Sequence, residues 1–283
     1  MPRDRPDLLA RVFKLKLDAL LKELYRDGIF GRTIAHLPVI EFQKRGLPHA
    51  HILIILAPED RLHSPEQIDA CVSAELPTPP SRTDFPSDSE FAAATARYER
   101  LARLVAECMT HNECGPDHPM AVCMRDGVCS KRYPKEFLDA TVFNEKEIYP
   151  KYRRRAPSAG GATYVYNGRT IDNRWIVPHS PYLLLKYECH LNVEVCVSVE
   201  SVKYLYKYVY KGPDRSMVAV REEREAAGDV DEIALYQDMR SLGSTEACWR
   251  TLNFAMYGKS PPVERLPVHL DEMQRCVYAT GTE

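Results

Sequence analysis

Residues 41–56 read EFQKRGLPHAHILIIL, and this stretch decides the expected fold. Runs of β-forming residues stand on both sides of a Lys-Arg-Gly turn. They predict an antiparallel hairpin whose strands are VIEFQ (39–43) and PHAHILIIL (48–56). Upstream, leucines and valines recur at helical spacing over residues 5–27, and Asp27-Gly28 is a typical helix end. A helix followed by a hairpin is therefore expected at the start of the chain.

Two histidines, His49 and His51, stand one residue apart at the start of the second strand. Side chains two apart in a strand share a face, so the two imidazoles project together. Glu41 and Gln43 share a face of the partner strand in the same way. Two imidazoles with one oxygen can hold a divalent metal ion and leave positions open for a phosphate oxygen. The alternative is a pair of partly exposed histidines without a ligand.

Composition restricts the classes of function. The chain has 283 residues, 45% of them hydrophobic, and a net charge of −2, so it is not basic as a whole. A run of eighteen apolar residues is absent from the sequence, which predicts no membrane span. The chain has nine cysteines, and its first residues lack the continuous apolar run of a secretory signal. This pattern favours a reducing compartment, where metal ligands or free thiols are expected rather than disulfides.

A tyrosine-rich segment, VKYLYKYVYKG (202–212), predicts an amphipathic helix. Tyr204 and Tyr208 are four residues apart, as are Tyr206 and Tyr210, so each pair shares a helix face. Three lysines form a further row at the same spacing: Lys203, Lys207 and Lys211. Tyrosine can attack phosphorus when a cation stabilises the developing charge, and lysines hold a DNA backbone. The alternative is ordinary packing of aromatic residues below a solvated lysine face.

A Cys/His-containing loop follows a predicted helix over residues 89–109. Its metal-ligand candidates are His111, Cys114, Cys123 and Cys129. Four such ligands can hold a structural zinc ion tetrahedrally, and Cys108 or His118 can replace one of them. The alternative is a set of buried thiols.

A short basic segment contains Lys151, Arg153, Arg154 and Arg155, interleaved with tyrosines. Arginines beside aromatic rings suit single-stranded DNA, through phosphate contacts and base stacking. The alternative is a solvated run of charge.

These motifs occur together in one order, and the order resembles that of a known family. The segments that carry the resemblance are FQKRGLPHAHIL, CMRDGVCSKRYPKEF, YPKYRRR, NRWIVPHSPYLLLKYECHLNVEV, SVKYLYKYVYKG and RLPVHL. They resemble the Rep domain of Helitron transposons, within the His-hydrophobic-His (HUH) endonucleases of rolling-circle replication. The resemblance implies an α+β fold in which a central antiparallel β-sheet, with the histidine strand in its interior, is flanked by helices and carries a Cys/His-rich insertion.

The resemblance also implies a domain organisation. Residues 1–260 are expected to form the endonuclease-like domain, with 57–135 as its insertion and a zinc-binding loop over 108–133. Residues 261–283 are expected to be irregular. Relatives carry a strand before the first helix, and a helicase with a phosphate-binding Gly-Lys-Thr loop. This chain shows neither, so we expect an N-terminally truncated fragment that lacks the helicase and has no ATPase activity.

The implied activity is metal-dependent nicking and strand transfer of single-stranded DNA, in the nucleus. Tyr204 and Tyr208 match the two tyrosines of the family and would form a 5′-phosphotyrosine bond. Mg²⁺ or Mn²⁺ would be held by His49 and His51. The third ligand is expected to be Gln43, then Glu41, with His190 as a further candidate. Lys207 and Lys211 would contact the DNA backbone.

Two other classes of function stay open at this stage. One is a catalytically inactive remnant that only binds single-stranded DNA. The other is a zinc-stabilised protein-interaction domain. Formation of a covalent DNA adduct distinguishes the nuclease from both.

Overall fold

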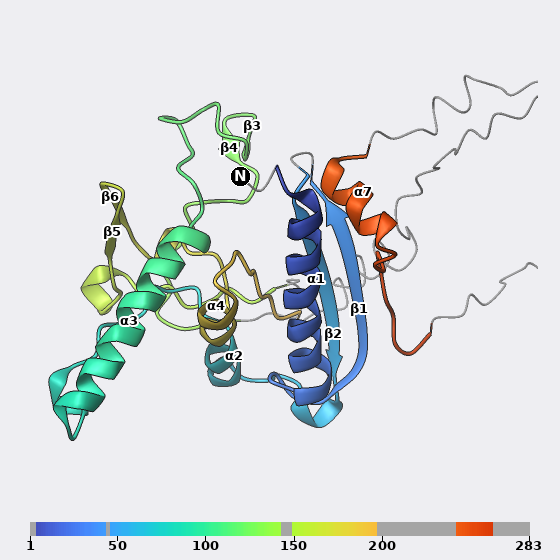
Figure 1. The fold of residues 1–283 in the computed structure, drawn as a ribbon. Coiled ribbons are helices and arrows are strands. Elements are labelled where there is room, and N and C mark those ends of the chain that lie inside the picture. Colours follow the sequence, from blue (N-terminus) through green and yellow to red (C-terminus); the bar gives the residue numbers. More distant parts are fainter. Residues whose placement is uncertain (1–3, 44–45, 143–148, 197–241, 263–283) are drawn as a thin grey trace, which may run out of the picture. The chain divides into compact units, whose positions relative to one another are not determined.

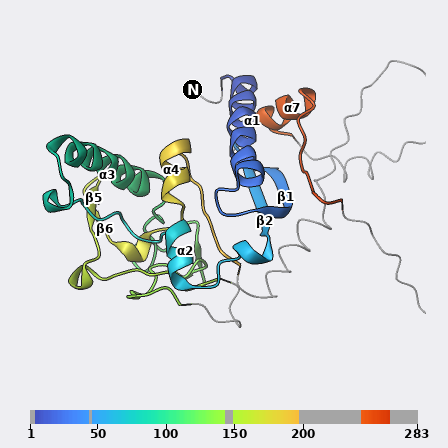
Figure 2. The same ribbon diagram turned by 90° about the horizontal axis from the view of Figure 1, so that it is seen from below.

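The computed structural model describes residues 4–43, 46–142, 149–196 and 242–262. The chain divides into two compact units: unit 1 comprises residues 1–57 and 212–283, and unit 2 comprises residues 58–211. The described residues form a mixed α+β structure with five α-helices and three two-stranded antiparallel sheets (Figures 1 and 2). The expected α+β class is therefore confirmed at this level.

Unit 1 begins with the predicted helix. Helix α1 spans Pro6–Lys22 and continues into a π-helical turn, Glu23–Asp27. Proline is at its first position, where a missing N–H costs nothing, and an acidic residue follows in the first turn. The helix ends at Gly28, whose φ of 62° is left-handed, a conformation that glycine adopts without strain.

The predicted hairpin is also present in unit 1. Strand β1 spans Thr33–Phe42 and pairs with β2, Pro48–Leu56, so that Glu41 lies opposite His49 and Val39 opposite His51. The second strand has its predicted bounds. The first strand begins six residues earlier than predicted, because Pro38 is accommodated within the ladder.

The core of unit 1 is apolar. Trp249, on helix α7 (Ser244–Thr251), is fully buried between α1 and the hairpin. Ala10 and Leu17 of α1 and Ile40 of β1 complete this cluster. Because side chains alternate across a strand, the face with Ile40 packs on the helices and the face with Glu41 points away from them.

A further segment of unit 1 runs along the outer edge of β1. The N–H of Ile40 donates to the carbonyl of Met256 at 2.7 Å. His36 and Ser260 exchange two backbone hydrogen bonds of 2.8 and 3.0 Å. Strand β1 therefore has backbone partners along both of its edges.

The described part of unit 2 contains three α-helices: α2 (Pro65–Cys71), α3 (Asp88–Cys108) and α4 (Pro181–Tyr187). Helix α2 starts with a capping box between Ser64 and Gln67, and α3 with a cap from Ser87. The sequence predicts a short helix near residues 65–74, within a Pro-, Ser- and Asp-rich loop, and a longer helix over 89–109, and the structure confirms both. Helix α4 has no counterpart in the sequence prediction.

The sheets of unit 2 are short: β3 (Met124–Arg125) with β4 (Val128–Cys129), and β5 (Tyr164–Tyr166) with β6 (Arg169–Ile171). The run GATYVYNGRTIDNRWIVP predicts a hairpin with its turn at Asn167-Gly168, and both residues have the positive φ that such a tight turn requires. The run HLNVEVCVSV predicts a strand over residues 190–199. Within its described part, 190–196, only an isolated bridge at Asn192 is seen. A larger central sheet is not seen among the described residues, so that part of the expectation stays a prediction.

Unit 2 combines an apolar core with buried polar groups. Leu104 and Val105 of α3 pack against Ile176 and Leu184. Nearby, polar side chains with at most 5% exposure include Glu75, Arg154 and Asn173. Buried polar groups are stable only when hydrogen-bonded, so the contacts of these three matter for the fold.

Candidate metal sites

The first candidate site is the outward face of the β1–β2 hairpin. His51 Nε2 lies 3.1 Å from Glu41 Oε2, and the rings of His49 and His51 have centroids 5.0 Å apart. The side chains of His51 and Glu41 are 36% and 44% exposed. The hairpin register creates this arrangement, because Glu41 lies opposite His49 and diagonal to His51.

These three side chains suit a hard divalent ion with open positions. An octahedral ion with ligand bonds near 2.1 Å separates neighbouring ligands by about 3 Å, which is close to the Nε2–Oε2 distance of 3.1 Å. Two nitrogens and one oxygen on one exposed face leave the remaining positions to water or substrate. The arrangement can therefore bind a metal that also contacts a phosphate.

The third-ligand candidates differ in position. Glu41 already contacts His51, whereas Gln43 lies one residue beyond β1 and is exposed. The carbonyl and N–H of Gln43 bond to Gly46 and Leu47 in the turn. His190 belongs to unit 2, where its Nδ1 lies 2.7 Å from the carbonyl oxygen of Cys108. The contact seen in the structure favours Glu41.

The predicted nucleophiles, Tyr204 and Tyr208, and the predicted DNA-contacting lysines, Lys207 and Lys211, lie outside the described residues. Their roles stay predictions.

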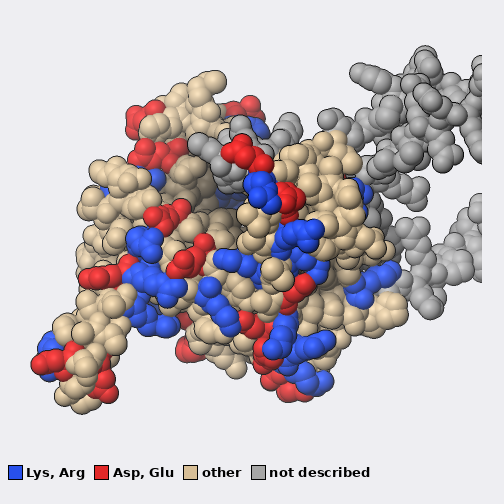
Figure 3. All heavy atoms as spheres, viewed as in Figure 1, with Lys and Arg blue, Asp and Glu red and all other residues tan. Residues whose placement is uncertain are grey.

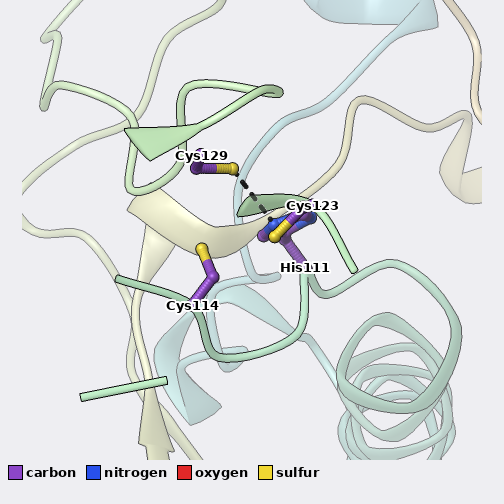
Figure 4. A group of neighbouring side chains, drawn as sticks. All are labelled: His111, Cys114, Cys123 and Cys129. Carbon is purple, nitrogen blue, oxygen red and sulfur yellow. Dashed lines mark hydrogen bonds between the residues drawn. The ribbon is translucent and has the colours of Figure 1, made fainter. Parts of the chain in front are cut away.

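The second candidate site is in unit 2 and contains His111, Cys114, Cys123 and Cys129. One ligand atom from each lies within 4.8 Å of the other three, and Cys129 Sγ is 3.5 Å from His111 Nε2. Figure 4 shows the four side chains turned toward a common space. The sequence prediction of this group is confirmed as a geometric cluster consistent with a zinc site.

Local backbone structure positions three of the four cluster residues, which all lie between residues 111 and 129. His111 follows α3 and is fixed by its N–H, which donates to the carbonyl of Trp175 at 2.8 Å. Cys123 immediately precedes β3, and Cys129 ends β4. The β3–β4 turn uses Asp126 and Gly127, both with positive φ. This tight turn returns Cys129 to within reach of Cys123.

The electrostatics of the cluster suit a cation. Burial lowers the pKa of His111, and the nearby charges of Lys135, Arg169 and Lys131 lower it further, so the imidazole is neutral at pH 7. A neutral imidazole has the lone pair that a metal needs.

The thiols of the cluster influence one another. Burial and the neighbouring thiols of Cys123 and Cys129 together raise the pKa of Cys114 to about 12. Burial also acts to raise the pKa of Cys129, but the net change is downward, because backbone N–H donors of Tyr133 and Lys131 and the thiols of Cys114 and Cys123 together lower it. Three thiolates this close repel one another, and a bound dication removes that penalty.

The two alternative ligands do not belong to the cluster. His118 Nε2 lies 3.3 Å from a carboxylate oxygen of Glu113, and Cys108 lies at the end of α3. Sequence reasoning missed Tyr133 and Trp175, whose rings are nearly parallel to that of His111. Spacing contains no signal for them, because the contacts arise only when distant segments pack together.

The predicted DNA-binding segment is only partly exposed, and its arginines have partners inside unit 2. Arg154 is 4% exposed, and its Nη1 donates to the carbonyls of three residues: Ala74, Asn173 and Ile176. Arg153 and Arg155 both form ion pairs with the buried carboxylate of Glu75. These contacts indicate a role in holding unit 2 together for all three arginines. Lys151 is exposed.

The distribution of charge on the surface does not single out a basic face in the view of Figure 3. Figure 3 shows basic and acidic side chains mixed over the face of the described residues that it draws. In the described part of the chain, no helix is long and apolar enough to span a membrane.

Part of the chain matches a model of a known protein family. Residues 1–54 match the family described as the Helitron helicase-like domain at the N-terminus. This span contains α1, β1, most of β2 and both histidines of the hairpin. A search of curated proteins found no match. The family match thus coincides with the first candidate site and does not include the second.

Proposed function

We propose that this chain is the DNA-nicking and strand-transfer part of a Helitron transposon protein. The observation that carries the proposal is the convergence of Glu41, His49 and His51 on one exposed face of the hairpin, inside the span that matches the family. The fuller expectation of a central sheet with the histidine strand in its interior belongs to this proposal.

Three side chains would hold the metal: His49, His51 and Glu41. The ion, Mg²⁺ or Mn²⁺, would stabilise the charge that develops on the scissile phosphate. Imidazole ligands favour Mn²⁺ over Mg²⁺. The role of the protein at this site is to fix these ligands on a paired strand, which is a more rigid base than a loop.

The nucleophile in the proposal is the phenol of Tyr204 or Tyr208. Its oxygen forms a bond to phosphorus as the bond from phosphorus to the 3′ oxygen breaks, and the released 3′ oxygen takes up a proton. The DNA 5′ phosphate is then joined to tyrosine. This ester keeps the energy of the phosphodiester, so a second DNA end can be rejoined without ATP. Two tyrosines allow two successive cleavages.

DNA binding in the proposal relies on Lys207 and Lys211, with Lys151 as an exposed contributor. Arg153, Arg154 and Arg155 contact residues inside unit 2, which favours a structural role for them over DNA binding. Chromosomal DNA as substrate places the protein in the nucleus.

Covalent trapping tests the proposal. The protein is incubated with Mn²⁺ and an end-labelled pool of single-stranded oligonucleotides with a randomised centre, then run on a denaturing gel. A protein–DNA adduct is expected. It should be lost in the double variant Tyr204→Phe/Tyr208→Phe and retained in Tyr206→Phe, the matched control outside the family pattern.

The same experiment distinguishes the nuclease from the two alternative functions, an inactive DNA-binding remnant and a protein-interaction domain. Binding of the labelled DNA without any adduct would support an inactive single-stranded-DNA-binding remnant. Absence of both binding and adduct would contradict a DNA function and favour a protein-interaction domain. An adduct that survives in His49→Ala/His51→Ala would overturn the metal assignment.

A further inference from the structure

We propose that unit 2 is a zinc-dependent fold, in which His111, Cys114, Cys123 and Cys129 bind one structural Zn²⁺ and Tyr133 holds the His111 ring in position. The family match and the proposed nicking reaction do not involve these residues. The inference therefore stands apart from the proposed function.

The donor set and its geometry fit zinc. Three thiolates and one imidazole are a common structural zinc set, and a tetrahedron with normal zinc bonds separates its ligand atoms by about 3.6–3.8 Å. Cys129 Sγ and His111 Nε2 are 3.5 Å apart, and all four ligand atoms lie within 4.8 Å of one another. Small side-chain movements close this set around one ion. Four protein ligands leave no position for a substrate, so the ion is structural.

The segment between the ligands has little apolar core of its own. Between residues 112 and 132, only Met124 and Cys129 are buried hydrophobic residues. Met120, Val122 and Val128 are 92%, 87% and 66% exposed. A segment that buries so little apolar surface cannot offset the entropy of ordering its chain, and a metal ion supplies the missing stabilisation.

The packing of the His111 ring determines which of its two nitrogens, Nε2, faces the other ligands. The ring stacks on Tyr133 with centroids 4.2 Å apart and planes 11° from parallel, and Trp175 lies almost parallel at 6.5 Å. The His111 N–H is bonded to the Trp175 carbonyl, so the backbone is fixed as well. The stack directs Nε2 toward Cys129. Tyr133 is thus a positioning residue for the metal ligand.

Metal content is the first test. Tag-free full-length protein, purified without chelator, should contain about one zinc per chain by mass spectrometry of the metal. The double variant Cys123→Ser/Cys129→Ser should contain at least tenfold less. Cys189→Ser, an exposed cysteine outside the cluster, is the matched control and should keep its zinc. Zinc-free wild type that takes up no zinc would overturn the proposal, as would unchanged zinc in the double variant.

A second test needs no variant and so does not depend on whether a variant folds. X-ray absorption at the zinc edge of the wild-type protein should show three sulfur ligands and one nitrogen ligand. Replacement by Co²⁺ should give the strong visible absorption of a tetrahedral thiolate site. A two-sulfur site, or one with oxygen ligands, would contradict this ligand set.

The positioning role of Tyr133 has its own test. Tyr133→Leu removes the stacked ring, whereas Tyr133→Phe keeps it. Competition with a chelator should show about tenfold weaker zinc binding for Tyr133→Leu, the lower end of the usual effect of groups that orient a ligand. Tyr133→Phe should match wild type. Equal affinity in all three proteins would remove the role of Tyr133 and leave the four ligands unaffected.

Discussion

The histidine face of the hairpin and the Cys/His cluster of unit 2 make a direct comparison, because both gather metal-ligand side chains in different ways. On the hairpin, neighbouring residues of two paired strands lie on one half-exposed face. In unit 2, four ligands from one long segment turn inward around a common space. The first arrangement leaves room for a substrate, and the second is closed.

The interiors of the two units differ in the charge that they bury. Unit 1 has apolar packing around Trp249 and a buried carboxylate, Glu246, which is 3% exposed and pairs with Arg250. Unit 2 buries both signs of charge, with Glu75 and Arg154 at 5% and 4% exposure. Because the hairpin site is half-exposed and the cluster has four protein ligands, a metal at the hairpin should affect the reaction more than the stability. A metal in the cluster should affect stability more than reaction.

Zinc removal should have the largest effect and should be confined to unit 2. The fluorescence of the two tryptophans of the chain can follow the unfolding of each unit separately. Trp175 lies beside the cluster in unit 2, and Trp249 is in the core of unit 1. In single-tryptophan variants, Cys123→Ser/Cys129→Ser should lower the free energy of unfolding seen by Trp175 by about 4 kcal/mol or more. Urea unfolding followed by fluorescence measures this. An equal loss seen by Trp249 would contradict the comparison.

Arg154→Met should have the next largest effect. The substitution removes the donor for three buried carbonyls and should destabilise unit 2 by about 3 kcal/mol. Lys151→Met, three residues away and exposed, is the control and should change stability by less than about 0.5 kcal/mol. Thermal unfolding of both proteins checks the difference. A stable Arg154→Met protein would mean that buried charge does not hold unit 2.

The pH dependence of unit 2 should show an effect of Glu194. Burial raises its pKa from 4.5 to about 7, and its Oε2 has no hydrogen-bond partner among the described residues. Because the folded state binds this proton more tightly than the unfolded state, the stabilisation is complete below pH 4.5. It is lost as pH rises through about 7.

Glu194→Gln should remove this dependence. At pH 8, the variant should be more stable than wild type by about 2 kcal/mol, and the difference should shrink toward pH 6. Unfolding of unit 2, followed by Trp175 fluorescence between pH 6 and 8, measures the effect. Glu136→Gln, at an exposed position, is the control and should follow wild type. A constant difference across this range would exclude titration of Glu194 as the cause.

The smallest effect is expected from the third ligand of the hairpin. Glu41→Ala should raise the Mn²⁺ concentration needed for adduct formation about tenfold, equivalent to ~1.4 kcal/mol. Gln43→Ala should leave it unchanged, because Glu41 Oε2 lies 3.1 Å from His51 Nε2 whereas Gln43 lies beyond the end of β1. If Gln43→Ala raised the Mn²⁺ requirement and Glu41→Ala did not, Gln43 would be the third ligand. Neither change should alter zinc content.

Local patterns in the sequence predicted the parts of the molecule that depend on local geometry. Alternation identified the hairpin and its histidine face, and the spacing of His111 and the three cysteines identified the cluster. The burial of Arg154 was not predictable, because its acceptors come from residues 74, 173 and 176 and meet only in the folded chain. Helix α4 was missed because a seven-residue run such as PYLLLKY shows too few turns to establish a period.

The segment that runs along β1 determines at which edge of the hairpin a further strand can pair. Since residues 256–260 occupy the outer edge of β1, the edge that remains for another strand, among the described residues, is that of β2. Any strand recruited there, from this chain or from another protein, would place His49 and His51 at the centre of a wider sheet. Recruitment of a strand would then stiffen the histidine pair without touching either imidazole.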